Sequence, residues 1–192
     1  TSAVTCETPD LSGDCADVSL SLMMGAVSIG NVLFQFYESP RVLALYPVMG
    51  PVDGGTSVNV DGRNIYSDTK CRFGDILVQI AVVYSTTRLS CVAPRQNATG
   101  LYAVELTSNE RDFTSDGHHF EYVAPISLEA VTPATGPSDG GSFVIVQGEH
   151  FSERAASLSY LTCRFNATVD PAIYISSSEI ACHAPEMAPG VV

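Results

Sequence analysis

Six cysteines are the residues of this 192-residue chain that are most able to do chemistry. Four of them stand in two pairs of similar spacing, Cys71 with Cys91 and Cys163 with Cys182, inside two stretches of related sequence. Neither spacing resembles the Cys-x-x-Cys arrangement of a zinc knuckle or of a redox site. The pattern predicts one disulfide in each stretch and, because disulfides persist in oxidising compartments, an extracellular or cell-surface location.

The other two cysteines, Cys6 and Cys15, leave two pairings open. Cys6 occupies in its own stretch the place that Cys91 occupies in the next, which predicts a partner further upstream. Cys15 has no equivalent elsewhere in the chain. A local disulfide between Cys6 and Cys15 is the alternative.

Asparagine supplies a second kind of modification site. Two Asn-x-Thr triplets begin at Asn97 and Asn166, and both fall in expected loops or strand ends. Such triplets are acceptors for N-glycosylation when they are exposed in a secreted protein. Together with the paired cysteines they predict a glycoprotein of the secretory pathway.

Groupings of residues that would support catalysis are not found. His118 and His119 are adjacent, so on a strand they point to opposite faces and cannot readily chelate one ion. Asp53 and Asp139 lie inside turn sequences, where an aspartate usually bonds its own backbone. There is no Gly-x-Ser-x-Gly sequence and no closely repeated Asp/Asn spacing of a calcium loop. We expect no enzyme activity, no cofactor and no metal site.

Charge and hydropathy exclude two further classes. Nine basic residues against 21 acidic ones give a net charge of -12, which would repel a phosphate backbone, so we expect no nucleic-acid partner. The apolar stretch 18–36 is interrupted by Ser, Gly, Asn and Gln and alternates with a period of two. This pattern does not fit a transmembrane helix, and we expect no direct insertion into a membrane.

The elements that must position these residues belong to a repeated module. The stretch 47–62, which contains a Gly-Pro-x-x-Gly-Gly turn sequence, returns 86 residues later as 133–148. A Cys-x-x-Pro sequence recurs in the second half of each unit, and it also appears at 6–9, where the front half of the unit is absent. Repetition of this kind indicates one small domain used several times. The predicted domains are the back half of a module (1–39), a complete module (40–124) and a module truncated near its C-terminal strands (125–192).

Local patterns within the modules favour strands. Segments 18–22, 57–61 and 102–106 alternate apolar and polar residues, as expected of strands with one solvated face. The longer apolar runs 78–84 and 142–146 predict strands that are covered on both faces or lie in a sandwich core. Gly62 and Gly148 are interpreted as turns at strand ends. No long segment keeps a helical stripe, so we expect almost no helix.

A module of this size with many short strands is typical of an immunoglobulin-like sandwich, although the usual core tryptophan is absent from the chain. The residues that narrow this class recur in both copies: Tyr46-Pro47, Gly50-Pro51, Gly54-Gly55, Gly62, Cys71-Arg72-Phe73 and Cys91-Val92-Ala93-Pro94, then Pro133, Gly136-Pro137, Gly140-Gly141, Gly148, Cys163-Arg164-Phe165 and Cys182-His183-Ala184-Pro185. In these residues the chain resembles the IPT/TIG domain, the immunoglobulin-like module of plexins, hepatocyte-growth-factor-type receptors, other cell-surface proteins and some transcription factors. The resemblance implies an all-β fold of tandem sandwiches arranged end to end.

We expect this protein to act through its shape and its contact surfaces and not through catalysis. Short proline-containing linkers predict a semi-rigid rod, and the resemblance implies a non-catalytic structural or recognition array of an extracellular glycoprotein: a spacer, adhesin, receptor stalk or surface-fibre shaft. Its partners would be other proteins, copies of itself, or glycans. One alternative is an accessory module of a secreted polysaccharide-active enzyme, with Tyr37, Tyr84 and Tyr160 as a sugar platform, although packing is the favoured role of these rings. The other is an intracellular scaffold or dimerisation domain with reduced cysteines.

Overall fold

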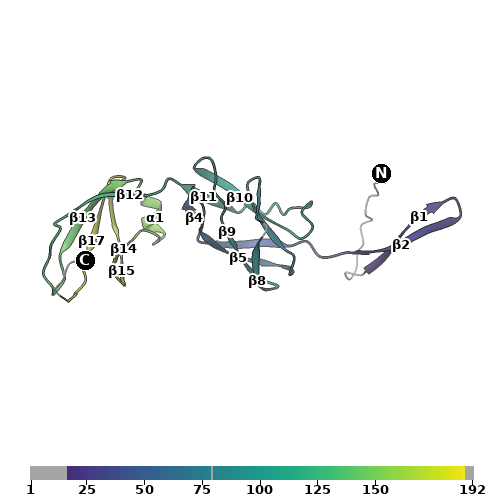
Figure 1. Cartoon of the computed structure of the whole chain (residues 1–192), viewed down its shortest axis with the longest axis horizontal. Helices are drawn as coiled ribbons and strands as arrows, with labels where there is room; N and C mark the ends of the chain where they lie inside the picture. Colours follow the sequence, from purple (N-terminus) through teal and green to yellow (C-terminus); the bar gives the residue numbers. More distant parts are fainter. Residues whose placement is uncertain (1–16, 79, 189–192) are drawn as a thin grey trace.

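The structure is a computed structural model that describes residues 17–78 and 80–188. Its strands form three parts in a row: a hairpin at one end, a sandwich in the middle and a smaller module at the other end (Figure 1). The chain passes from one part to the next without returning, so sequence order and spatial order agree. The prediction of tandem immunoglobulin-like modules is confirmed.

The first part is an antiparallel hairpin of β1 (Asp17–Met24) and β2 (Val27–Gln35). Gly25 occupies the turn with a φ of 66°, a conformation that glycine adopts without steric cost. Val18 lies opposite Phe34, and Leu20 lies opposite Val32. Side chains of both strands are largely exposed.

The middle module is a sandwich of two sheets. One sheet has four strands in the order β3 (Arg41–Tyr46), β5 (Ser57–Arg63), β9 (Arg88–Val92) and β8 (Ala81–Ser85). The other has five, in the order β4 (Met49–Pro51), β11 (His119–Val123), β10 (Gly100–Thr107), β6 (Lys70–Phe73) and β7 (Ile76–Val78). All neighbouring strands are antiparallel except β4 and β11, which run parallel.

The core lies between the two sheets and is built by alternation. In β5, Val58 and Val60 are fully buried while Ser57 and Asn59 face solvent, as the alternating pattern predicts. The opposite sheet contributes the buried aromatic side chains, among them Phe73 and Phe120, whose ring centroids are 5.7 Å apart in an edge-to-face arrangement. The hydrophobic core cluster includes six residues of that sheet: Cys71, Phe73, Val104, Leu106, Phe120 and Tyr122.

The last module repeats this plan with fewer strands. Its larger sheet has the order β12 (Ser127–Thr132), β13 (Phe143–Glu149), β17 (Glu179–His183) and β16 (Ile173–Ser176). A second, two-stranded sheet contains β14 (Thr162–Phe165) and β15 (Thr168–Pro171). Along the chain, a short helix, α1 (Glu153–Ser157), lies between β13 and β14, and its N-terminus is capped by Ser152 through a 3.2 Å bond from the Ala155 amide to Oγ.

The two Gly-Pro-x-x-Gly-Gly turns occupy equivalent places. The Gly55 amide donates to the Ala93 carbonyl at 2.9 Å, and the Gly141 amide donates to the Ala184 carbonyl at 3.0 Å. One bond therefore ties each glycine corner to the Cys-x-x-Pro segment of its own module. Within each turn, Gly54 donates to Pro51 and Gly140 donates to Pro137. The two corners of the repeat thus fold alike.

The interpretation of Gly62 and Gly148 as turns at strand ends is wrong. Both lie inside strands, β5 and β13, next to a shift of register in the neighbouring strand. A Cβ atom on Gly62 would stand 2.3 Å from the Arg41 carbonyl oxygen, and one on Gly148 would stand 2.1 Å from the Ser127 carbonyl oxygen. Glycine is needed because the two backbones approach closely at this bulge.

The longer apolar runs fit only one of the two predicted alternatives, that of strands in a sandwich core, and the first run is not a single strand. The run 78–84 is divided between β7 in one sheet and β8 in the other, with Val82 and Tyr84 exposed. In β13, Val144 is buried but Phe143 is 57% exposed, so this strand is not covered on both faces. Apolar composition alone does not reveal where a chain changes sheets.

Candidate functional site

A disulfide joins the two sheets of each module. Cys71 on β6 is bonded to Cys91 on β9 with the Cα atoms 6.4 Å apart, and Cys163 on β14 is bonded to Cys182 on β17 with the Cα atoms 6.0 Å apart. All four residues are buried. They hold the sandwich together and are not available as nucleophiles. Cys6 and Cys15 lie outside the described residues.

Both candidate glycosylation sites are on the surface. Asn97 lies in an exposed bend before β10. Asn166 is exposed in the turn between β14 and β15, where it adopts a φ of 51°. Each position can accept a glycan without disturbing the core, and glycosylation there remains a prediction.

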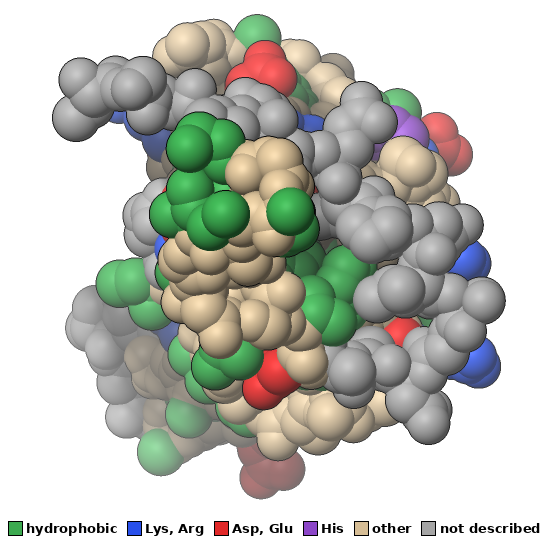
Figure 2. Space-filling view, turned by 90° about the vertical axis from the view of Figure 1, so that its right-hand side faces the viewer, with side chains coloured by type: hydrophobic (Ala, Val, Ile, Leu, Met, Phe, Trp, Pro, Cys, Tyr) green, Lys and Arg blue, Asp and Glu red, His purple; other side chains and the backbone are tan. Residues whose placement is uncertain are grey.

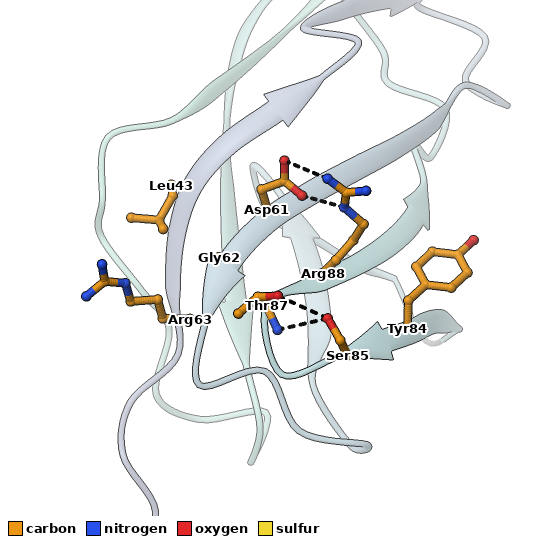
Figure 3. Close-up of a pocket in the computed structure, with 8 residues that line it drawn as sticks. All are labelled: Leu43, Asp61, Gly62, Arg63, Tyr84, Ser85, Thr87 and Arg88. Atoms are coloured by element: carbon orange, nitrogen blue, oxygen red, sulfur yellow. Dashed lines mark hydrogen bonds and ion pairs between the residues drawn. The ribbon is translucent and has the colours of Figure 1, made fainter.

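A shallow depression lies on the outer face of the four-stranded sheet in the middle module (Figure 3). It has a volume of about 490 Å³ and receives side chains from all four strands or their connecting turns. It is lined by Leu43, Asp61, Gly62, Arg63, Tyr84, Ser85, Thr87 and Arg88. The sheet positions these residues by alternation, since the positions between them point into the core.

An ion pair occupies the centre of this depression. Arg88 Nε donates to Asp61 Oδ1 at 2.6 Å, and a terminal guanidinium nitrogen of Arg88 donates to Oδ2 at 3.2 Å (Figure 3). The hydrogen bond from Arg88 lowers the pKa of Asp61 below its ordinary value. The two residues are direct cross-strand partners on β5 and β9. Because both side chains remain about half exposed, the pair adds little stability and can be contacted by a partner.

The side chains on this surface can form hydrogen bonds with a bound partner. Ser85 Oγ accepts from the Thr87 amide at 3.2 Å, and Tyr84 is 62% exposed beside it. Such groups can exchange hydrogen bonds with a peptide or a sugar. No group of three or more His, Cys, Asp or Glu side chains that could hold a metal ion occurs among the described residues.

The four histidines lie apart from the depression and in different settings. His119 is exposed, with Nδ1 2.9 Å from the Gly117 carbonyl oxygen, while His118 is half-buried. His150 is exposed, and its Nδ1 lies 3.0 Å from the Pro125 carbonyl oxygen at the linker. His183 packs edge-to-face against Phe143. Each of these contacts is structural.

The three tyrosines considered as a sugar platform do not gather on one surface. Tyr37 packs edge-to-face on Tyr66, and Tyr160 packs in the same way on Tyr46, each with 5.9 Å between ring centroids. Both contacts join residues of successive modules. Tyr84 alone of the three lines the depression.

Sequence reasoning missed the contacts that join the middle and last modules. Arg154, in α1, places Nε 3.1 Å from Glu121 Oε2 on β11. Tyr160, which follows α1, accepts through Oη from the Val48 amide at 3.3 Å. The capping residue Ser152 followed by Glu153 was the available signal for α1, but nothing in the sequence indicated that this helix faces the preceding module.

The junction between the hairpin and the middle module is also packed. The Asn64 side-chain amide donates to the Ser39 carbonyl at 3.2 Å. With the contact between Tyr37 and Tyr66, this bond holds the linker 36–40 against the middle module. In that environment the pKa of Tyr37 is raised, chiefly by burial and further by Asp112 and Asp68.

Comparison with known proteins agrees with this architecture. The family model for the IPT/TIG domain matches residues 40–122 and 126–192. The chain is 27% identical over 168 residues to Plexin-2 of Caenorhabditis elegans, covering 86% of this chain and 9% of the relative. It is 25% identical over 190 residues to Plexin-B3 of Homo sapiens, covering 92% of this chain and 9% of the relative. The chain therefore spans about a tenth of the length of these curated relatives.

A solved structure of the full extracellular region of Plexin A4 shares the fold. It aligns with a TM-score of 0.51 and 20% sequence identity, covering 83% of this chain and 14% of that one. In the part of the chain that the structure describes, no helix has the length and apolar character needed to cross a bilayer. The family model matches twice, and each match contains one module that is closed by a disulfide. The chain therefore belongs to the IPT/TIG domain family.

Proposed function

We propose that this chain is a non-catalytic structural and recognition segment of an extracellular or cell-surface glycoprotein. In this role it holds its modules at a fixed spacing and presents exposed sheet faces to other proteins. The observation that carries the proposal is the direct contact of successive modules across very short linkers. A spacer needs this feature, whereas an enzyme would need a reactive cluster.

The linker between the middle and last modules is short, and the two modules that it joins also contact each other directly. Only residues 124–126 separate β11 from β12, and Pro125 limits their backbone freedom. The contacts of Arg154 and Tyr160 connect α1 and the segment after it to the middle module. A single exposed ion pair contributes little, but several contacts made together with a short linker leave few relative orientations.

The proposed compartment follows from the covalent chemistry. Disulfides in both modules favour an oxidising environment, and the exposed Asn97 and Asn166 would carry glycans there. The net charge of -12 favours solubility and contact with a basic partner surface. An intracellular scaffold would instead keep its cysteines reduced.

The spacing role predicts a narrow distribution of distances between the two modules. Spin labels placed at the exposed Asn59 and Ser177 by chemistry that does not use cysteine would report this distribution by pulsed electron resonance. Combining Arg154→Ala with Tyr160→Ala removes both junction contacts and is expected to broaden the distribution at least about twofold. The matched control is Glu153→Ala, an exposed position of the same helix that takes no part in these two contacts.

Two outcomes would contradict this role. One is a broad distribution in the unmodified protein. The other is a narrow distribution that the double substitution leaves unchanged, which would show that the contacts of Arg154 and Tyr160 do not set the spacing.

A further inference from the structure

The four-stranded sheets of the two modules carry opposite charges. In the middle module the strands β3, β5, β9 and β8 contain three arginines and one aspartate, a net charge of +2. The equivalent strands of the last module, β12, β13, β17 and β16, contain three glutamates and no lysine or arginine, a net charge of -3 with histidine neutral. Because the whole chain carries -12, the sheet of the middle module is a local exception.

A pair of arginines accounts for much of this difference. Arg41 and Arg63 lie directly opposite each other on β3 and β5, and both are exposed. The last module has Ser127 opposite Glu149 at the same place. Like charges directly opposite each other destabilise a sheet, and no ion pair within the described part of the chain includes either arginine. A bound anion would offset their repulsion.

The depression on the outer face of this sheet adjoins the arginine pair. Arg63 belongs to its lining, and Arg88 lies in its centre together with Asp61 (Figure 3). Arg88 bonds Asp61 through Nε and one terminal nitrogen, so its second terminal nitrogen can donate to a ligand. In the last module the ion pair is replaced by a hydrogen bond of 3.2 Å from Gln147 to Glu179, which offers no cation.

The remaining lining favours a glycan over an acidic stretch of protein. Tyr84 is 62% exposed, so its ring can stack on a sugar ring. The hydroxyl groups of Ser85 and Thr87 are 3.1 Å apart in the same lining and can bond to sugar hydroxyls. A protein partner would need a buried apolar anchor, whereas Leu43 and Tyr84 are the only apolar side chains that line this shallow depression.

The negative charge of the whole chain does not prevent such contact. In the view from the hairpin end, basic and acidic side chains lie interspersed among the residues that are drawn in colour (Figure 2). Exposed charges that are further apart than about 8 Å are largely screened at physiological salt. The local arginines therefore decide whether an anion binds at this sheet.

We propose that the outer face of the sheet of β3, β5, β9 and β8 binds an acidic glycan, a chain of sugars that carries sulfate or carboxylate groups. Arg41, Arg63 and Arg88 would bind the acidic groups, because the planar guanidinium fits such groups with two parallel hydrogen bonds. Tyr84 would stack on a sugar ring. This inference rests on the proposed function, since it assigns a partner to one exposed sheet face of an extracellular segment.

Isothermal titration calorimetry of the whole chain at about 0.15 M salt tests the proposal. One probe is a heparin oligosaccharide, which carries sulfate and carboxylate groups, and the other is an oligogalacturonate, which carries carboxylates alone. Binding of both would assign the contact to carboxylates, and binding of heparin alone would assign it to sulfates. Combining Arg41→Ala with Arg63→Ala is expected to weaken heparin binding about a hundredfold, at about tenfold for each charge-assisted bond.

The matched control combines Arg95→Ala with Arg164→Ala. It removes the same charge from two exposed positions outside the proposed site and should change the affinity for heparin by less than about twofold. Equal weakening by the two double variants would show nonspecific attraction of a polyanion, which would overturn the proposal. Failure of both oligosaccharides to bind the unmodified chain would also overturn it.

Tyr84→Ala separates a glycan from an acidic protein segment. This change is expected to weaken heparin binding about fivefold, whereas Tyr84→Phe keeps the ring and should retain most of the affinity. A polyglutamate peptide, which offers carboxylates without sugar rings, should bind more weakly than the heparin oligosaccharide. Equal affinity for this peptide, or heparin binding that Tyr84→Ala leaves unchanged, would contradict the proposal in favour of an acidic protein segment.

A second copy of the chain is the other occupant to test, because its last module presents three glutamates. Dimers of the unmodified chain that the change of Arg41 and Arg63 abolishes in sedimentation velocity would assign the face to that copy and contradict the proposal. None of these outcomes affects the spacing role, because the distance between Asn59 and Ser177 is measured within one copy without a ligand.

Discussion

Replacing Cys71 and Cys91 together by alanine is expected to lower the free energy of unfolding of the middle module by about 3 kcal/mol. The bond closes a loop with a sequence separation of 20 and joins the two sheets at positions that are 0% and 1% exposed. Without it the unfolded chain gains conformational freedom. Denaturant unfolding followed by far-ultraviolet circular dichroism and tyrosine fluorescence measures the effect, since the chain contains no tryptophan.

The matched control is the same double replacement at Cys163 and Cys182. It should shift the unfolding of the last module by a similar amount, because its sequence separation is 19, and leave the transition of the middle module in place. If both double variants shifted one common transition equally, the modules would not be separate folding units, and the account of independent repeats would be wrong.

Replacing Gly54 by alanine is expected to destabilise the middle module by about 3 kcal/mol. Part of this cost is backbone strain, since Gly54 has a φ of 80°, where a side-chained residue loses about 1–2 kcal/mol. The remainder is overpacking of about 1–3 kcal/mol, because the new Cβ would stand 2.6 Å from the Arg95 amide nitrogen and 2.7 Å from the Ala93 carbonyl oxygen. Thermal and denaturant unfolding measure the sum.

Gly55 provides the control for this substitution. It has a similar φ of 85°, but a Cβ there meets nothing within 4 Å, so Gly55→Ala should cost only the strain, about 1–2 kcal/mol. The last module offers an independent repeat, with Gly140 crowded by the Glu186 amide at 2.5 Å and Gly141 open. Equal costs at Gly54 and Gly55 would show that the corner does not pack on the Cys-x-x-Pro segment.

The features that could be predicted from the sequence are those carried by repetition and by a period of two. The repeated Gly-Pro-x-x-Gly-Gly and Cys-x-x-Pro sequences indicated that the same corner occurs twice, and Gly55 and Gly141 make equivalent hydrogen bonds. Alternation in 57–61 correctly identified Val58 and Val60 as core residues. Both signals are local, so one sequence is enough to detect them.

The features that could not be predicted depend on which strands become neighbours. The sequence gives no sign that Gly62 lies close to the Arg41 backbone, because this contact arises only when β3 pairs with β5 around a bulge. For this reason the interpretation of Gly62 as a turn is wrong. The ion pair between Asp61 and Arg88 joins residues 27 positions apart on an exposed face, where neither burial nor periodicity gives a signal. The five-residue helix α1 is too short for a helical stripe to appear.

The junction contacts of the last module show the same limit. Arg154 and Tyr160 look like ordinary surface residues in sequence, and their role follows only from the position of the preceding module. The hairpin of β1 and β2 is the opposite case. The alternation in 18–22 is a local signal, and it correctly indicates the strand β1.

The central claim is that one β-sandwich module, closed by a disulfide between its sheets, is used repeatedly along this chain. Mass spectrometry of an unreduced proteolytic digest tests it most directly. We expect peptides that link Cys71 to Cys91 and Cys163 to Cys182, with no free thiol at these four positions, and the same digest identifies the partners of Cys6 and Cys15. Free thiols at these four positions, or a link between Cys71 and Cys163, would contradict the account.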